Sequence, residues 1–175
     1  MQMQYAGFTG TGHALGAEII TNDFLAERLG VTEEWIECRT GIKNRRYAAV
    51  GEYTSTLAVR AAGHALEAAQ IEASELDLII CATVTPDFLQ IPATAGIVQA
   101  ELSAKRAAAF DSAACSGFLF GLDTAQKFVP SGVYKNVLVI GADLMTRCVD
   151  AADAQTAILF ADSFQRQYQL GFGNY

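Results

Sequence analysis

Cys115 lies where the sequence predicts a change from strand to helix. The strand ends near Asp111, small residues such as Ala113 and Ala114 follow, and an apolar helix is predicted from Ser116. The free N–H groups and positive dipole end of a helix N-terminus favour the thiolate, which is the nucleophilic form of cysteine. A free cysteine is also a common small core residue. The local chemistry therefore leaves two interpretations open, a nucleophile and a core residue.

The other cysteines, Cys38, Cys81 and Cys148, lie far apart in the sequence. They form no Cys-x-x-Cys pair and have no histidine at ligand spacing, which argues against a zinc site and predicts no metal. No export signal is visible at the N-terminus, so we expect an intracellular, cytoplasmic domain whose thiols stay reduced.

The charge balance argues against nucleic-acid binding. The 175 residues include 12 Lys and Arg against 19 Asp and Glu, for a net charge of -7, whereas nucleic-acid binding needs an electropositive face. No apolar stretch reaches the roughly 18 residues of a membrane span. One basic run stands out, formed by Arg39, Lys43, Arg45 and Arg46. It is either a solvated loop or a contact surface for an anion, such as a phosphate-bearing cofactor or an acidic partner protein.

Apolar periodicity predicts alternating strands and helices along the whole chain. Strands are predicted over 5–10, 76–84, 106–111, 136–142 and 157–160. Helices are predicted over 54–70, 93–102 and 116–129, with two short helices that begin at Thr21 and Thr32 and end at Gly30 and Gly41. Buried strands joined by helices indicate an α/β fold, with a mixed, mostly parallel sheet and helices on both faces. The helix over 116–129 is apolar on nearly every side, as in a fully buried helix.

Two separate motifs resemble the ketoacyl synthase III family of thiolase-like condensing enzymes. Asp111–Gly117 resembles the nucleophile segment of that family. Glu34–Ile42, followed by Arg45 and Arg46, resembles its Trp-Ile-x-x-Arg-Thr-Gly-Ile-x-x-Arg-Arg signature. The resemblance covers residues 1–162 and implies one half of a thiolase-like fold, the N-terminal half-domain, with 163–175 as a divergent tail.

The resemblance also implies roles for individual residues. Cys115 would accept an acyl group from an acyl-coenzyme A as a thioester, with its own backbone N–H as an oxyanion donor. Trp35 would stack on the adenine of coenzyme A, Arg39 would contact its nucleotide end, and Ile91 would wall the acyl pocket. The phosphates or an acidic acyl carrier protein would meet a patch formed by Lys43, Arg45 and Arg46. Acyl-coenzyme A is then a substrate, no cofactor is permanently bound, and condensation with a malonyl carrier protein would serve fatty-acid biosynthesis.

The chain also departs from that family. Family members are about twice as long, and their second half supplies a catalytic His and Asn; His13 and His64 match neither. An adenine-contacting Arg of the family is replaced by Ala154 or Gln155, and the pattern is lost after Asp162.

Without a second half, the apolar face of Phe118, Phe120 and Leu122 would be exposed, which predicts self-association or pairing with a complementary half. The alternatives are an inactive fragment, an interaction subunit, or another thiolase-fold synthase of the polyketide type.

Overall fold

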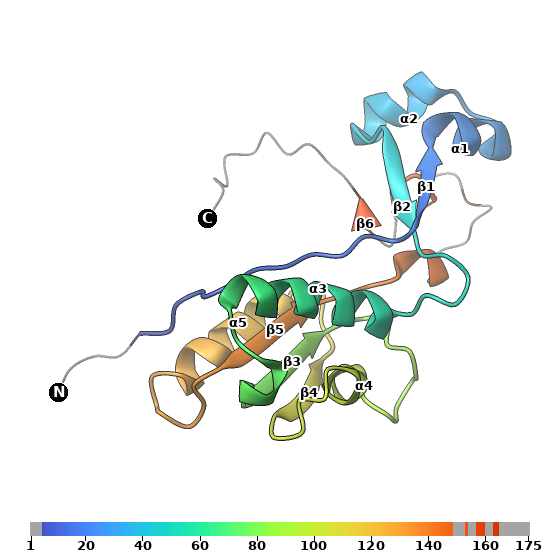
Figure 1. The fold of residues 1–175 in the computed structure, drawn as a ribbon. Helices are drawn as coiled ribbons and strands as arrows, with labels where there is room; N and C mark the ends of the chain where they lie inside the picture. The colour runs from blue at the N-terminus through green and yellow to red at the C-terminus, as the bar shows by residue number, and fades with distance from the viewer. Residues whose placement is uncertain (1–4, 149–152, 154–156, 160–162, 165–175) are drawn as a thin grey trace. The chain divides into compact units, whose positions relative to one another are not determined.

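The computed structural model describes residues 5–148, 153, 157–159 and 163–164. The chain forms two compact units (Figure 1). The larger unit comprises Met1–Ala14 and Gly51–Asp143, and the smaller comprises Leu15–Val50 and Leu144–Tyr175. The segment predicted as one half-domain over 1–162 thus contains parts of both units. Of the predicted tail, only Ser163 and Phe164 fall within the described residues.

The larger unit is built on a parallel sheet. β3 (Leu78–Ala82) is the central strand, between β4 (Ala108–Ser112) and β5 (Val137–Gly141). All five residues of β3 are buried, as expected for a strand covered on both faces. The strands predicted in these three regions are confirmed.

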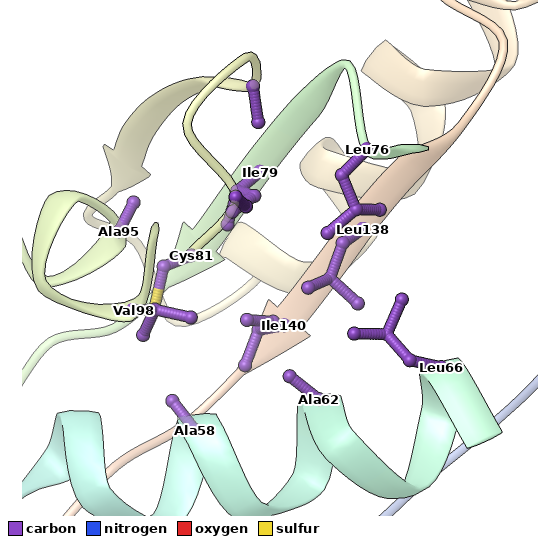
Figure 2. Close-up of a cluster of buried hydrophobic side chains, with 12 residues drawn as sticks. Ala58, Ala62, Leu66, Leu76, Ile79, Cys81, Ala95, Val98, Leu138 and Ile140 are labelled. Carbon is purple, nitrogen blue, oxygen red and sulfur yellow. The ribbon is translucent and has the colours of Figure 1, made fainter. Parts of the chain in front are cut away.

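Helices cover both faces of this sheet. α3 (Thr54–Ala69) and α4 (Thr94–Glu101) pack on one face, and α5 (Gly117–Phe128) packs on the other. The chain passes from β3 to β4 in one direction and from β4 to β5 in the other, so right-handed crossovers place α4 and α5 on opposite faces. The core between the sheet, α3 and α4 is shown in Figure 2 and includes Ala58, Ala62, Leu66, Leu76, Ile79, Cys81, Ala95, Val98, Leu138 and Ile140.

The smaller unit contains two short helices, α1 (Asn22–Leu29) and α2 (Glu33–Thr40). Both begin at the predicted threonines, whose hydroxyl oxygens accept the backbone N–H of Phe24 at 3.3 Å and of Trp35 at 3.1 Å. Both end at a glycine with φ of +66°, a conformation that glycine adopts without strain. These local signals explain why the sequence predicted both helices correctly.

An antiparallel sheet completes the smaller unit. It is formed by β1 (Glu18–Thr21), β2 (Asn44–Tyr47) and β6 (Ser163–Phe164), with β2 in the centre. These strands were not predicted from the sequence, because they are short and β2 is mostly polar. Two 3₁₀ turns lie outside the sheets, over Ala73–Glu75 in the larger unit and Met145–Arg147 in the smaller one.

The strand predicted over 5–10 is wrong. This segment forms no strand and lies along α3 instead (Figure 1). A Cβ atom at Gly10 would lie 2.4 Å from the carbonyl oxygen of Ala65, and one at Gly12 would lie 2.2 Å from that of Ala61. The two glycines therefore let the backbone contact the helix directly.

The strand predicted over 157–160 is also wrong where the structure describes it. Ala157 is helical, and its N–H donates to the Asp153 carbonyl at 2.9 Å. Ile158 is buried in a cluster with Leu25 and Ile36. Periodicity alone cannot distinguish a short buried strand from a short buried helical turn.

Candidate active site

Cys115 is exposed and lies two residues before the first residue of α5. Ser116 is the N-cap, and its carbonyl accepts the N–H of Phe120 at 3.1 Å. The N–H of Gly117 donates to the Ala114 carbonyl at 2.8 Å, which closes a tight turn around the cysteine. The predicted position at the start of a helix is confirmed, and Cys115 is an exposed residue of the larger unit.

Gly117 allows the helix to begin directly on the sheet. A Cβ atom there would lie 2.7 Å from the carbonyl oxygen of Ser112 and 3.1 Å from the Cβ of Ala82. Ser112 and Ala82 are the last residues of β4 and β3. Cys115 therefore belongs to the carboxyl edge of the parallel sheet, where ligands bind in open α/β folds.

Asp111 ties the strand before Cys115 to the next layer. Its two carboxylate oxygens accept the backbone N–H groups of Thr94 and Ala95, both at 2.7 Å. These N–H groups lie in the first turn of α4, where a negative charge also complements the helix dipole. Asp111 thus fixes the start of α4 against the strand that leads to the candidate nucleophile.

Asp143 holds the loop that leaves β3. One carboxylate oxygen accepts hydrogen bonds from the Thr83 hydroxyl at 3.0 Å, the Val84 N–H at 2.8 Å and the Thr85 hydroxyl at 3.2 Å. The Thr54 hydroxyl donates to the Thr85 carbonyl at 2.6 Å. No role was predicted for Asp111 or Asp143 from the sequence. They could have been identified in the sequence as polar residues near the carboxyl ends of predicted buried strands.

The remaining thiols and histidines do not complete a metal site. Burial raises the pKa of the Cys81 thiol to about 12, so it stays protonated. The Nδ1 atom of His64 lies 2.8 Å from the carbonyl oxygen of His13. Within the described part of the chain, no three His, Cys, Asp or Glu residues are grouped as metal ligands.

Trp35 and Arg39 are brought together on α2 in the smaller unit. The guanidinium carbon of Arg39 lies 4.2 Å from the centre of the Trp35 ring, a cation–π contact. Trp35 is half-buried and packs against the cluster that contains Leu25 and Ile36. The pair presents a flat aromatic group and a cation on one helical turn.

Arg45 does not form part of an exposed patch, and the prediction that it does is wrong. Its side chain is 0% exposed. Nε and Nη2 donate to the Ile158 carbonyl at 3.2 and 2.8 Å, and Nη1 donates to Asn22 Oδ1 at 2.9 Å. Burial lowers the pKa of this guanidinium from its usual range. Arg45 therefore links α1, β2 and the turn at Ile158.

The other residues of the basic run differ in exposure. The Lys43 side chain is 78% exposed, and its ammonium lies 3.8 Å from a carboxylate oxygen of Glu37. Arg46 is half-buried, and its Nη1 donates to the Gly16 carbonyl at 3.4 Å. Lys43 and Arg39 are the members of the run exposed to solvent.

Ile91 lies in the loop between β3 and α4 and is 86% exposed. Its predicted role as a wall of an acyl pocket stays a prediction. The positions predicted to replace the adenine-contacting arginine, Ala154 and Gln155, lie outside the described residues, as do Phe160–Asp162.

No helix among the described residues is long and apolar enough to cross a membrane.

Comparisons with known proteins identify relatives of this fold and site. The profile of the 3-oxoacyl-[acyl-carrier-protein] synthase III family matches residues 110–163, which include the Cys115 segment. Beta-ketoacyl-[acyl-carrier-protein] synthase III of Xylella fastidiosa is 50% identical over 159 residues, which are 90% of this chain and 49% of that protein.

Solved structures show the same relationship. The crystal structure of 3-oxoacyl-[acyl-carrier-protein] synthase III from Aquifex aeolicus has a TM-score of 0.84 and 45% identity, over 92% of this chain and 51% of that one. The priming beta-ketosynthase of a polyketide biosynthetic pathway has a TM-score of 0.87 and 34% identity, over 92% and 48% of the two chains.

The fold is that of the thiolase-like condensing enzymes, as the sequence predicted. The chain spans about half the length of the curated relatives it matches. Over 90% of its length the chain is similar to beta-ketoacyl-[acyl-carrier-protein] synthase III, and it is a partial chain about the size of the N-terminal half of such a protein.

Proposed function

We propose that this chain carries the acyl-accepting part of a beta-ketoacyl-[acyl-carrier-protein] synthase III, with Cys115 as the nucleophile. The observation that supports this most directly is the exposed cysteine at the carboxyl edge of the parallel sheet, just before α5. The proposal places the reaction in fatty-acid biosynthesis in the cytoplasm, as the sequence resemblance implies, and the relatives' name, beta-ketoacyl-[acyl-carrier-protein] synthase III, is consistent with it.

The proposed reaction is a thioester exchange. The Cys115 thiol loses its proton, and the thiolate attacks the carbonyl carbon of an acyl-coenzyme A. The carbon–sulfur bond to coenzyme A breaks, and the departing thiolate takes up a proton to become free coenzyme A. A backbone N–H at the turn, that of Cys115 itself, would stabilise the negative oxygen formed on the way.

Binding of the coenzyme A part of the substrate is assigned to residues of the smaller unit, Trp35 and Arg39. Trp35 offers a ring face to the adenine, and Arg39 offers a cation to the nucleotide phosphates. Lys43, which is exposed on the loop after α2, would extend this positive surface toward the phosphates or toward an acidic acyl carrier protein. Ile91 would contact the acyl chain. Buried Arg45 is left out of this surface, and Arg46 contributes only its exposed part.

Intact-mass measurement after incubation with acetyl-coenzyme A tests the proposal. We expect one acetyl adduct on the chain and none on the Cys115→Ser variant. Cys38→Ser is a matched control, because Cys38 is also an exposed free thiol, and it should keep the adduct. An unmodified chain, or an adduct that survives Cys115→Ser, would contradict the proposal and favour the inert fragment or interaction subunit.

A second measurement tests the assigned coenzyme A site. Trp35→Ala and Arg39→Ala should raise the acetyl-coenzyme A concentration needed for half-maximal adduct formation. They should leave the rate with the small thioester S-acetyl-N-acetylcysteamine unchanged, because that reagent lacks the nucleotide. An equal loss of adduct formation with both acyl donors would indicate that Trp35 and Arg39 are needed for folding instead.

A further inference from the structure

Arg45 is a buried cation to which the proposed reaction gives no role. The sequence placed it in an exposed patch with Lys43 and Arg46, but its side chain is 0% exposed. Its guanidinium donates instead to Asn22 Oδ1 and to the Ile158 carbonyl, within the smaller unit. A buried charge is stable only where its hydrogen bonds are well made. The groups that these bonds hold in place therefore indicate what Arg45 does.

One path of hydrogen bonds leads from Arg45 to the end of α2. Nη1 of Arg45 donates to Asn22 Oδ1 at 2.9 Å, and Asn22 Nδ2 donates to the Ile42 carbonyl at 2.7 Å. The Ile42 N–H donates to the Thr40 hydroxyl at 3.0 Å, and this hydroxyl donates to the Ile36 carbonyl at 2.8 Å. Every residue on this path is buried. The path therefore fixes the last turn of α2 from inside the smaller unit.

A second path leads from Arg45 to the same turn through apolar packing. Nε and Nη2 of Arg45 both donate to the Ile158 carbonyl, at 3.2 and 2.8 Å. The Ile158 side chain is buried in one cluster with Leu25 and Ile36, and Trp35 packs against this cluster. Arg45 thus holds the turn at Ile158 against the part of α2 that carries Trp35.

The Trp35–Arg39 pair needs such support because its own side chains are not enclosed. Trp35 is half-buried and Arg39 is exposed. Their helix has 8 residues, a length at which a helix is marginal without tertiary packing. A site that is already ordered before its ligand arrives binds more tightly, because the ligand does not have to order it.

We infer that Arg45 is a positioning residue, which fixes the Trp35–Arg39 pair in the orientation that binds the nucleotide end of coenzyme A. Both paths meet at Ile36, which follows Trp35 and lies three residues before Arg39. The planar fork of the guanidinium presents donors toward α1 and toward the turn at Ile158 at the same time, a geometry that the compact ammonium of lysine cannot reproduce. This inference rests on the proposed function, because it takes Trp35 and Arg39 as the coenzyme A site.

Trp35 fluorescence tests the inference, because Trp35 is the only tryptophan of the chain. Coenzyme A should quench the Trp35 emission of the wild type. Arg45→Lys should raise the coenzyme A concentration for half-maximal quenching at least about fivefold, because the ligand must then order both side chains of the pair. Arg28→Lys is the matched control, because Arg28 is an exposed arginine of α1, and it should bind like the wild type.

The possible results separate the inference from the proposed function. Equal half-maximal concentrations in Arg45→Lys and the wild type would overturn the inference and leave the proposed function intact. Wild-type emission that coenzyme A does not change would overturn the assigned coenzyme A site, and the inference with it.

Asn22→Ala tests the hydrogen-bonded path without changing Arg45. It removes the acceptor of Arg45 Nη1 and the donor to the Ile42 carbonyl, so it should also weaken coenzyme A binding. The double variant with Arg45→Lys should be weakened by less than the product of the two single effects, because both changes interrupt one path. Circular dichroism verifies that each variant is folded. Unchanged affinity in folded Asn22→Ala, or independent effects of the two changes, would overturn the inference.

The acyl-transfer reaction separates positioning from general stability. In Arg45→Lys, the acetyl-coenzyme A concentration for half-maximal adduct formation at Cys115 should rise by the same factor as in the fluorescence titration, with the maximal rate unchanged. The rate with S-acetyl-N-acetylcysteamine should equal that of the wild type, because this reagent lacks the nucleotide. An equal loss with both acyl donors would show that Arg45 only stabilises the fold, which would overturn the inference.

Discussion

Asp111 is the residue whose geometry constrains the candidate site most directly. It accepts two helical N–H groups at 2.7 Å with its two oxygens. Asp111→Asn keeps the shape but leaves one acceptor and no charge. We expect a loss of about 1.5–3 kcal/mol in the free energy of unfolding, the range of hydrogen bonds to charged groups, in urea titrations. Asp87→Asn is the control, because Asp87 accepts one hydrogen bond within the described part of the chain, from the Ser55 N–H at 3.3 Å. An equal loss of stability in that variant would contradict the role of Asp111.

The four cysteines should divide into two classes. Cys38, Cys115 and Cys148 are exposed, whereas Cys81 is buried and its pKa is raised to about 12. At pH 8 the Cys81 thiol is therefore both covered and protonated. Iodoacetamide should add three groups to the native chain, counted by intact mass, and a fourth only in denaturant. Fast native labelling of Cys81 would show that the core in Figure 2 opens.

The ionisation of Asp77 should make the free energy of unfolding depend on pH. Its carboxylate accepts the backbone N–H groups of Lys135 and Asn136 at 2.8 and 3.1 Å, and these bonds hold the pKa of Asp77 below its usual range. The ionised form is thus favoured in the folded state. This contribution is present above about pH 4 and is lost as the pH falls through the lowered pKa.

Asp77→Asn tests this dependence. The free energy of unfolding of the wild type should fall more steeply below pH 4 than that of Asp77→Asn, in urea titrations at several pH values. Parallel curves would show that the folded state gains nothing from the Asp77 charge.

At the level of elements, the packing of α5 on the sheet depends on a small residue. A Cβ atom at Gly121 would lie 2.8 Å from Cγ1 of Val139, a side chain with little freedom to move. Gly121→Ala should therefore destabilise the chain by about 1–3 kcal/mol, as overpacking does, despite a better helix propensity.

The control is Gly63→Ala in α3, where nothing lies within 4 Å of the added atom. That change should stabilise the chain by up to about 1 kcal/mol. Thermal unfolding of both variants measures the difference. Stabilisation by Gly121→Ala would show that α5 lies farther from β5.

Elements with local signals were predictable from the sequence, and elements defined by distant partners were not. α1, α2 and α3 follow from caps and periodicity within their own residues. β2 is polar and depends on β1 and β6 for its pairing, so no local pattern indicated a strand. Cys115 was found because its turn is local. Arg45 was misplaced because its partners, Asn22 and Ile158, are 23 and 113 positions away in the chain.

At the level of the whole molecule, the sequence correctly predicted that α5 is apolar on nearly every side. The prediction that α5 is buried on every side was wrong. The sequence pattern was typical of a helix buried on every side, whereas the sheet covers only one side of α5 in this chain. Phe118, Leu119 and Phe120 are 43%, 65% and 58% exposed. Among the described residues, these three side chains form the exposed apolar face on α5 that was predicted.

This face predicts that the chain self-associates. Burying large apolar side chains contributes about 1.5–3 kcal/mol each relative to leaving them exposed, so association through α5 would be favourable. Sedimentation velocity should show a sedimentation coefficient that rises with concentration. The double variant Leu119→Lys, Phe120→Lys should remain monomeric, since pairing would now bury charges. Val50→Lys, at a fully exposed position outside α5, should associate like the wild type. A wild-type chain that stays monomeric at every concentration would show that this exposed face does not drive association.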